Sequence, residues 1–284
     1  VNGKCPEHPN REIEIVEEEN YFFRFSRYQG ELLSLYREQS QFVVPEKRLN
    51  EIVAFVERGL QDFSISRLVS KMPWGIPVPD DEEHVMYVWF DALVNYISTI
   101  GWNVDQEQFE KFWPGVQIAG KDNLRQQTAM WQAMLLSAGL APSKQILIHG
   151  HITCNGQKMS KSLGNVVSPE EMIERFGKDG TRYLLLSAAT FGEDIDLSWE
   201  RMTEKYNADL ANGLGNLVSR VLKLASQLTT HDVQQTTIFP EEFSALLENY
   251  RLSEGLEYIW NIVRESNKYI EENKPWELAK TNPE

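Results

Sequence analysis

The residues most able to do chemistry lie together in one stretch, QKMSKSLGN (157–165). It places Lys158 and Lys161 three positions apart, with Ser160 and Ser162 as further hydrogen-bond donors. A lysine ammonium is a compact charge on a flexible stem, so it can follow a phosphate group that moves during a reaction. A lone K-x-x-K pair is typical of a solvated surface loop. The complete string, placed between a predicted strand and a predicted helix, favours phosphate chemistry instead.

Three short apolar runs, each bounded by glycine or polar residues, predict the buried strands that position this loop. They cover 84–90, 115–120 and 145–150. Between the last two, 121–139 carries apolar residues at helical spacing. A strand, a helix and a second strand in this order form a βαβ unit, so these strands are expected to be parallel. The ends of such strands are where open α/β sheets bind ligands.

The last part of the chain is predicted to be helical. A helix at 168–177 begins with Ser168 as its cap and ends at Gly177. Longer helical patterns follow at 199–228 and 241–273. The predicted fold class is therefore α/β followed by all-α.

Composition limits the possible partners and location. The 284 residues carry a net charge of −14, and much of the acid lies at 12–20 and 79–84, away from the lysines. Such a body repels polyanions in bulk, so any nucleic-acid site must be local. There is no run of about 18 apolar residues, which predicts no membrane span. Two cysteines and no signal-peptide pattern predict reduced thiols and a cytoplasmic protein.

Lys158 to Ser162 match the KMSKS signature of class I aminoacyl-tRNA synthetases. Other stretches resemble the methionyl-tRNA synthetase family, in its order: YVWFDALVNY (87–96), AGKDN (119–123), HGHITCNGQKMSKSLGN (149–165), DIDLSWE (194–200) and KPWELAK (274–280). EENYFFRFSRYQ (18–29) and FSISR (63–67) resemble the connective insertion of that family. The resemblance covers essentially the whole chain.

The resemblance implies four parts. They are the tail of a connective insertion (1–84), the second half of a Rossmann-type catalytic domain (85–151), a stem-contact region with the KMSKS loop (152–198) and an incomplete anticodon-binding helical bundle (199–284). The other family signature, His-Ile-Gly-His, belongs to the first Rossmann half and is absent from the sequence. The first residue is not Met, and the sequence stops just after a helical pattern. We therefore expect a fragment at both ends.

The implied reaction joins the carboxylate of methionine to the α-phosphate of Mg²⁺-ATP, and then transfers methionine to tRNA-Met. Negative charge builds on the phosphates, so cations that bind the transition state more tightly speed the step. Lys161 matches the main phosphate-stabilising lysine of the family, and Lys158 assists it. The implied ATP-binding residues are Lys161, Ser160, Gly120, Asp122 and Ile152. For Asp122 the alternative is a plain N-cap of the following helix.

The implied methionine pocket consists of Trp89, Ala92, Leu93, Tyr96 and Gln127. By composition alone, core packing explains the two aromatic residues better than a binding pocket does. The sequence departs from the family where Phe-His is usual, because it has Gln126-Gln127 there. Gln127 can still form hydrogen bonds through either end of its amide, whereas Gln126 cannot replace an aromatic face.

A zinc site is implied only in half. Cys5 and His8 form a C-x-x-H pair that resembles the second half of the family's zinc knuckle. A tetrahedral structural zinc needs four ligands, so this chain alone is expected to bind zinc weakly if at all.

The resemblance also implies anticodon readers, namely Asn216, Arg220 and Trp276. Single-stranded bases stack on aromatic side chains, and Asn and Arg hydrogen-bond to base edges. Without the resemblance, Asn216 and Arg220 would be read as a solvated helix face.

The sequence therefore predicts part of a methionine–tRNA ligase, inactive in isolation. One alternative is another class I synthetase of the Leu, Ile, Val or Cys group, against which the three anticodon residues argue. The other is a tRNA-binding module without catalysis, which the absent His-Ile-Gly-His half favours for this polypeptide.

Overall fold

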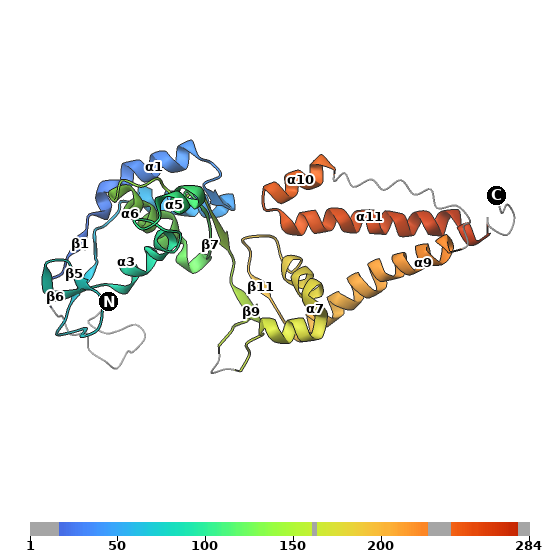
Figure 1. The fold of residues 1–284 in the computed structure, drawn as a ribbon. Coiled ribbons are helices and arrows are strands. Elements are labelled where there is room, and N and C mark those ends of the chain that lie inside the picture. Colours follow the sequence, from blue (N-terminus) through green and yellow to red (C-terminus); the bar gives the residue numbers. More distant parts are fainter. Residues whose placement is uncertain (1–16, 161–163, 227–239, 278–284) are drawn as a thin grey trace. The chain divides into compact units, whose positions relative to one another are not determined.

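The computed structural model describes residues 17–160, 164–226 and 240–277 of the chain (Figure 1). The KMSKS residues Lys161 and Ser162 lie outside this part, as do Cys5 and His8. The chain divides into a first unit, Val1–Leu147, and a second unit, Ile148–Glu284. Each is described by itself. No described helix is both long enough and apolar enough to cross a membrane.

The first unit combines short strands with helices. Its elements are β1 (Phe22–Phe23), η1 (Phe25–Tyr28), α1 (Gln29–Glu38), β2 (Val43–Val44), α2 (Glu46–Glu57), β3 (Phe63–Ser64), β4 (Ser66–Leu68), β5 (Pro77–Val78), β6 (Asp81–Met86), α3 (Val88–Leu93), α4 (Asn95–Ser98), α5 (Gln106–Phe112), β7 (Val116–Gly120), η2 (Lys121–Asn123), the π-helical turn η3 (Gln126–Met130), α6 (Trp131–Ser137) and β8 (Gln145–His149), whose end crosses the unit boundary.

The main sheet has the strand order β2-β8-β7, and β2 runs parallel to β8. The central strand β8 is buried on both faces, as predicted, with Ile146 and Ile148 on one face and Leu147 on the other. The strand β7 lies at the edge in the described part of the chain and alternates: Ile118 is 64% exposed, whereas Gln117 is buried. The prediction of a fully buried strand at 115–120 is therefore wrong, because that apolar run faces inward only at every second residue.

The predicted strand at 84–90 is correct only in its first half. β6 ends at Met86, and α3 begins at Val88. β6 belongs to a separate antiparallel sheet of order β4-β6-β5, not to the parallel sheet. A short apolar run does not distinguish a strand from a helix, and Asp91 to Leu93 extend the helical pattern.

The second unit contains β9 (Ile152–Cys154), β10 (Gln157–Lys158), α7 (Pro169–Leu186), β11 (Ile195–Asp196), α8 (Trp199–Lys205), the π-helical stretch η5 (Tyr206–Gly215), α9 (Asn216–Ala225), α10 (Glu241–Glu248) and α11 (Leu252–Asn273). The α/β class followed by helices is confirmed. Ser168 caps α7 as predicted, because its Oγ accepts from the Glu171 amide at 3.1 Å. Gly177 interrupts α7 with a φ of 71°, which a residue with a side chain rarely adopts.

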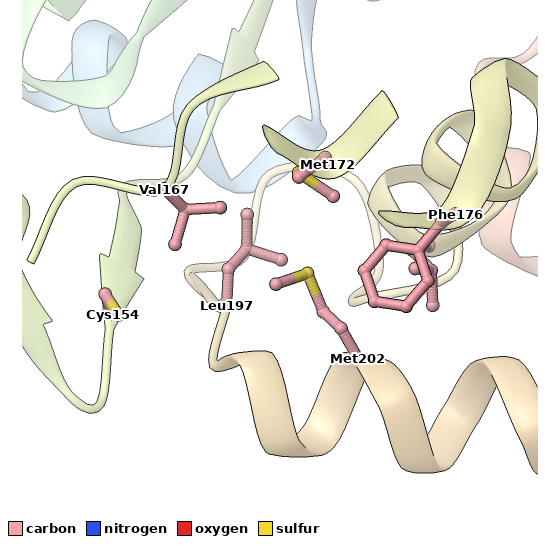
Figure 2. Close-up of a cluster of buried hydrophobic side chains, with 7 residues drawn as sticks. Cys154, Val167, Met172, Phe176, Leu197 and Met202 are labelled. Atoms are coloured by element: carbon pink, nitrogen blue, oxygen red, sulfur yellow. The ribbon is translucent and has the colours of Figure 1, made fainter. Parts of the chain in front are cut away.

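A cluster of buried apolar side chains holds the second unit together around its small sheet (Figure 2). It consists of Cys154, Val167, Met172, Phe176, Leu184, Leu197 and Met202, and Met159, Tyr183, Trp199 and Tyr206 pack against it. Burying each large apolar side chain contributes about 1.5–3 kcal/mol. Val167 belongs to this core cluster and Met159 packs against it. The cluster therefore holds the chain on both sides of the KMSKS loop.

Candidate active site

Lys158 stands at the end of a hairpin whose turn is tightly fixed. β9 and β10 pair in antiparallel fashion across Asn155 and Gly156, whose φ angles are 52° and 72°. Positive φ at both positions is the geometry of the type I′ turns that join hairpin strands. The Asn-Gly pair adopts this geometry at little cost, so the local sequence itself dictates the hairpin.

Asp196 at the end of β11 holds this turn from the side. Its Oδ1 accepts from the Gly156 amide at 2.7 Å and from Thr153 Oγ1 at 3.0 Å. Its Oδ2 pairs with Arg201 Nη1 at 2.9 Å. The bond from Gly156 and those from Thr153 and Arg201 lower the pKa of Asp196 below its usual value. An ionised Asp196 therefore anchors the hairpin that presents the exposed Lys158.

The other residues expected at the nucleotide divide between the units. In the second unit, Ile152 is 41% exposed on β9 and lines a largely apolar cavity of about 270 Å³. In the first unit, Gly120 ends β7 and directly precedes η2, and Asp122 is exposed within that turn. Gly120, not Asp122, thus occupies the capping position of the turn. Lys161 lies outside the described residues, so its role remains a prediction.

The structure brings together two of the residues expected at methionine. Gln127 Nε2 donates to the Tyr96 hydroxyl at 2.6 Å. The ring of Tyr96 lies 6.2 Å from that of Trp131, between centroids. The sequence predicts Trp131 only as one of the apolar residues at helical spacing within 121–139. The sequence signal that Trp131 lies near Gln127 is their spacing of four residues, because residues four apart share a helix face.

The remaining expected pocket residues lie on α3. Trp89 is 46% exposed, Ala92 is half-buried and Leu93 is buried. The exposure of Trp89 argues against simple core packing for this side chain, whereas the burial of Leu93 fits either reading. The helix thus presents an aromatic face to solvent in the described part of the chain.

Gln127 lies in the π-helical turn η3, and side chains hold carbonyl groups within this turn and just before it. Thr128 Oγ1 donates to the Leu124 carbonyl at 2.6 Å, and Gln132 Nε2 donates to the Gln127 carbonyl at 2.8 Å. The Tyr36 hydroxyl donates to the Thr128 carbonyl, also at 2.6 Å. Isolated π-turns of this kind recur at functional sites. These bonds fix the backbone that aims Gln127 at its partner.

The amide of Gln127 is not fully satisfied. Its Oε1 is buried and has no hydrogen-bond partner among the described residues, and the same is true of Gln126 Oε1. A buried acceptor without a partner is costly, by about 1–3 kcal/mol. Such groups are explained by strain or by a ligand or ordered water that completes the bond.

A separate polar cluster joins residues 19–21 of the first unit to residues 81–84. His84 Nδ1 lies 2.9 Å from Asp81 Oδ2, and its Nε2 lies 2.9 Å from the Glu19 carbonyl. Tyr21 also donates to Asp81 Oδ2, at 2.9 Å. Because both ring nitrogens of His84 face acceptors, the doubly protonated imidazolium satisfies both. The Glu19 carbonyl and then Asp81 accordingly raise the pKa of His84.

The expected anticodon residues lie at two positions on the helices of the second unit. Asn216 begins α9 and is exposed, and Arg220 follows one turn later. Arg220 Nη1 pairs with Glu271 Oε1 of α11 at 3.2 Å, so it also links two helices. Trp276 is 43% exposed just after α11. Figure 1 shows α9 and α11 running side by side over part of their length.

No metal site is found in the described ranges, where no three His, Cys, Asp or Glu side chains group closely enough to hold an ion. The half zinc site predicted at Cys5 and His8 lies outside them. The zinc expectation therefore remains a prediction.

Comparison with known proteins agrees with the motifs. Residues 2–222 match the family model described as tRNA synthetases class I (M). The chain is 43% identical to a methionine–tRNA ligase of Thermotoga maritima, covering 97% of this chain and 46% of that protein. A methionine–tRNA ligase of Synechocystis is also 43% identical, with 98% and 56% covered. The chain spans about half the length of the curated relatives it matches.

Solved structures give the same answer. The methionyl-tRNA synthetase of Mycobacterium tuberculosis in complex with methionyl-adenylate has a TM-score of 0.80 and 39% identity to this chain. The similarity covers 93% of this chain and 55% of that one. The ligand-free form of the same enzyme gives a TM-score of 0.77 at 36% identity, with 94% and 55% covered. Because the family model matches most of its length, the chain belongs to the class I (M) family of tRNA synthetases.

Proposed function

We propose that this chain forms part of a methionine–tRNA ligase and carries the lysine side of the site that activates methionine with ATP. The observation that carries the proposal is the hairpin ending at Lys158, which Asp196 fixes at its turn. In the reaction, a carboxylate oxygen of methionine bonds to the α-phosphorus and the bond to pyrophosphate breaks. The ammonium groups of Lys158 and Lys161 offset the charge that builds on the phosphates.

The first unit supports methionine as the amino acid. Trp89, which is 46% exposed, offers apolar contact area, and a thioether packs well against aromatic rings because its sulfur is polarizable. Gln127 and Tyr96, which are also expected at this pocket, form one hydrogen-bonded polar pair. A thioether is a weak acceptor, which fits a pocket with few polar groups.

The second step would transfer methionine to the terminal adenosine of tRNA-Met. Asn216, Arg220 and Trp276 support recognition of the anticodon through base edges and stacking. In the full-length protein, Trp276→Ala should weaken charging of tRNA-Met and leave methionine activation unchanged. An equal loss in both assays would indicate a folding defect and contradict this role.

The test of the activation step is methionine-dependent ATP–pyrophosphate exchange by the full-length protein that contains this chain. Lys161→Ala should reduce exchange about a hundredfold, equivalent to roughly 3 kcal/mol, by analogy with the loss of one oxyanion donor. Lys178→Ala serves as control, since this lysine is exposed on α7 and outside the loop. Full activity in Lys161→Ala would refute the phosphate role. Exchange stimulated by leucine or valine, but not methionine, would favour another class I synthetase.

A second candidate function for the isolated chain is tRNA binding without catalysis. The chain covers about half of its relatives and lacks the His-Ile-Gly-His signature. We therefore expect tRNA-Met binding in a gel-shift assay but no exchange activity from this polypeptide alone. Robust exchange by the chain alone would show that the expected missing half is not needed.

The cofactors follow from the same proposal. Mg²⁺ usually binds through substrate phosphates with one or two carboxylates, so we place it on ATP rather than in a protein cage. Zinc would need two ligands in addition to Cys5 and His8. We therefore assign zinc no part in the reaction.

A further inference from the structure

Asn165 makes two hydrogen bonds to the backbone of the lysine hairpin. Its Oδ1 accepts from the Ser160 amide at 2.8 Å, and its Nδ2 donates to the Lys158 carbonyl at 3.2 Å. One side-chain amide thus engages the residue that carries the ammonium and the residue two positions beyond it. We call this pair of bonds the Asn165 clasp.

The clasp completes a frame that the rest of the second unit provides. Asp196 fixes the turn before β10, as described above. Met159 packs against the core cluster, and Val167, 9% exposed, is a member of it. The chain therefore meets the same core shortly after Lys158 and shortly after Asn165. Between these anchors, the clasp supplies two side-chain hydrogen bonds to the backbone of residues 158–160.

The chemistry of the clasp requires an amide. Asparagine offers one acceptor and one donor, and both are used here. Aspartate can accept from the Ser160 amide but cannot donate to the Lys158 carbonyl, and leucine can do neither. Gly164, with a φ of 64°, turns the backbone immediately before Asn165 in a conformation that favours glycine.

We propose that Asn165 is a positioning residue, whose amide holds β10 so that the Lys158 ammonium is presented to the phosphates of a bound nucleotide. The nucleotide in this statement rests on the proposed function, whereas the clasp itself does not. Asn165 does not touch the reacting atoms; it acts through the backbone of Lys158. Loss of the clasp should therefore lower the rate of activation more than it changes the affinity for the amino acid.

The first measurement concerns the clasp and uses the 284-residue chain itself. Amide hydrogen exchange at Ser160 is followed in the wild type and in Asn165→Leu and Asn165→Asp. We expect exchange about tenfold faster in Asn165→Leu, which loses both bonds, each worth several-fold in an equilibrium. Asn165→Asp keeps the acceptor, so Ser160 should stay within about threefold of wild type. Gln157→Ala, an exposed change on β10, is the matched control and should leave Ser160 unaffected.

The second measurement concerns positioning and uses the full-length protein in ATP–pyrophosphate exchange. Asn165→Asp should lower kcat about tenfold and leave KM for methionine within about twofold, a split that general destabilisation does not produce. Unchanged kcat in this variant, or unchanged Ser160 exchange in a folded Asn165→Leu, would overturn the proposal. If Asn165→Leu fails to fold, the kcat of the near-isosteric Asn165→Asp alone decides whether Asn165 is a positioning residue. Absence of any exchange in wild type would refute the proposed function and the nucleotide part of this inference, while the hydrogen-exchange result would still decide the clasp.

Discussion

Gln132 offers a sharp test of how the first unit holds its candidate methionine pocket. The residue is fully buried on α6, and its amide makes three hydrogen bonds. Nε2 donates to the Gln127 carbonyl at 2.8 Å and to Ser143 Oγ at 3.1 Å, and Oε1 accepts from the Ser143 amide at 2.9 Å. Ser143 Oγ continues the network to Gln117 on β7, at 2.8 Å. Gln132→Met keeps the length of the side chain and removes all three bonds.

The expected loss of stability can be worked from these bonds. The Ser143 amide loses its acceptor in a buried place, which costs about 1–3 kcal/mol. The two bonds that Gln132 donates are each worth about 1 kcal/mol. The apolar methionine side chain offsets part of this loss, because it no longer has to bury an amide. We expect the free energy of unfolding to fall by about 2–4 kcal/mol, or roughly 6–12 °C in Tm for a domain of this size.

The matched control is the glutamine that begins the same π-turn. Gln126 Oε1 is buried without a partner among the described residues, so Gln126→Met should be neutral or slightly stabilising. Both variants are compared by urea and thermal unfolding, with hydrogen exchange of 121–147 to localise the effect to the first unit. A change below about 0.5 kcal/mol in Gln132→Met would refute the reasoning. Equal losses in the two variants would show that volume, not hydrogen bonding, decides.

Two further predictions concern the same unit. His84 has a raised pKa in the folded chain, so its contribution to stability is full below its unfolded pKa of about 6.5 and is lost as the pH rises through the raised value. The stability difference between wild type and His84→Gln should thus be larger near about pH 5.5 than near about pH 8.5, and equal differences in urea unfolding would contradict it. Tyr36→Phe keeps the ring in the core but removes the donor to the Thr128 carbonyl, so unfolding should need about 1–3 kcal/mol less. The exposed Tyr269→Phe is its control, and the same loss in both would exclude the buried hydrogen bond as the cause.

The sequence predicts best where a local rule determines the structure. Ser168 is predicted correctly as the cap of α7, because a serine followed by proline and two glutamates is typical of a helix N-terminus. The interrupted α7 at Gly177 follows from the same kind of rule. The run at 84–90 fails because its apolar pattern is shared by a strand and a helix, and only tertiary packing separates them at Tyr87.

The sequence names the residues expected at the candidate site, but it does not predict their hydrogen bonds. The departure at Gln126-Gln127 is visible in the sequence, and so is the ability of Gln127 to form hydrogen bonds. That it meets Tyr96 depends on the π-turn, which rests on Tyr36 and Gln132, residues far from it in sequence or unremarkable in type. No local pattern encodes such a turn, because its stability comes from partners on other elements.

The same geometry explains what the two glutamines change. When Gln127 Nε2 donates to the Tyr96 hydroxyl, the hydroxyl keeps its own hydrogen for another acceptor. Gln127 Oε1 then remains buried and unsatisfied among the described residues. If the amide is turned over, Tyr96 donates instead and Gln127 presents two N–H groups. Either arrangement keeps an N–H or O–H donor, so the proposed methionine site would offer one hydrogen bond to the thioether, which is a weak acceptor. Gln127 therefore keeps a hydrogen-bonding group where the family usually has His, whereas Gln126 supplies no aromatic face in place of the usual Phe.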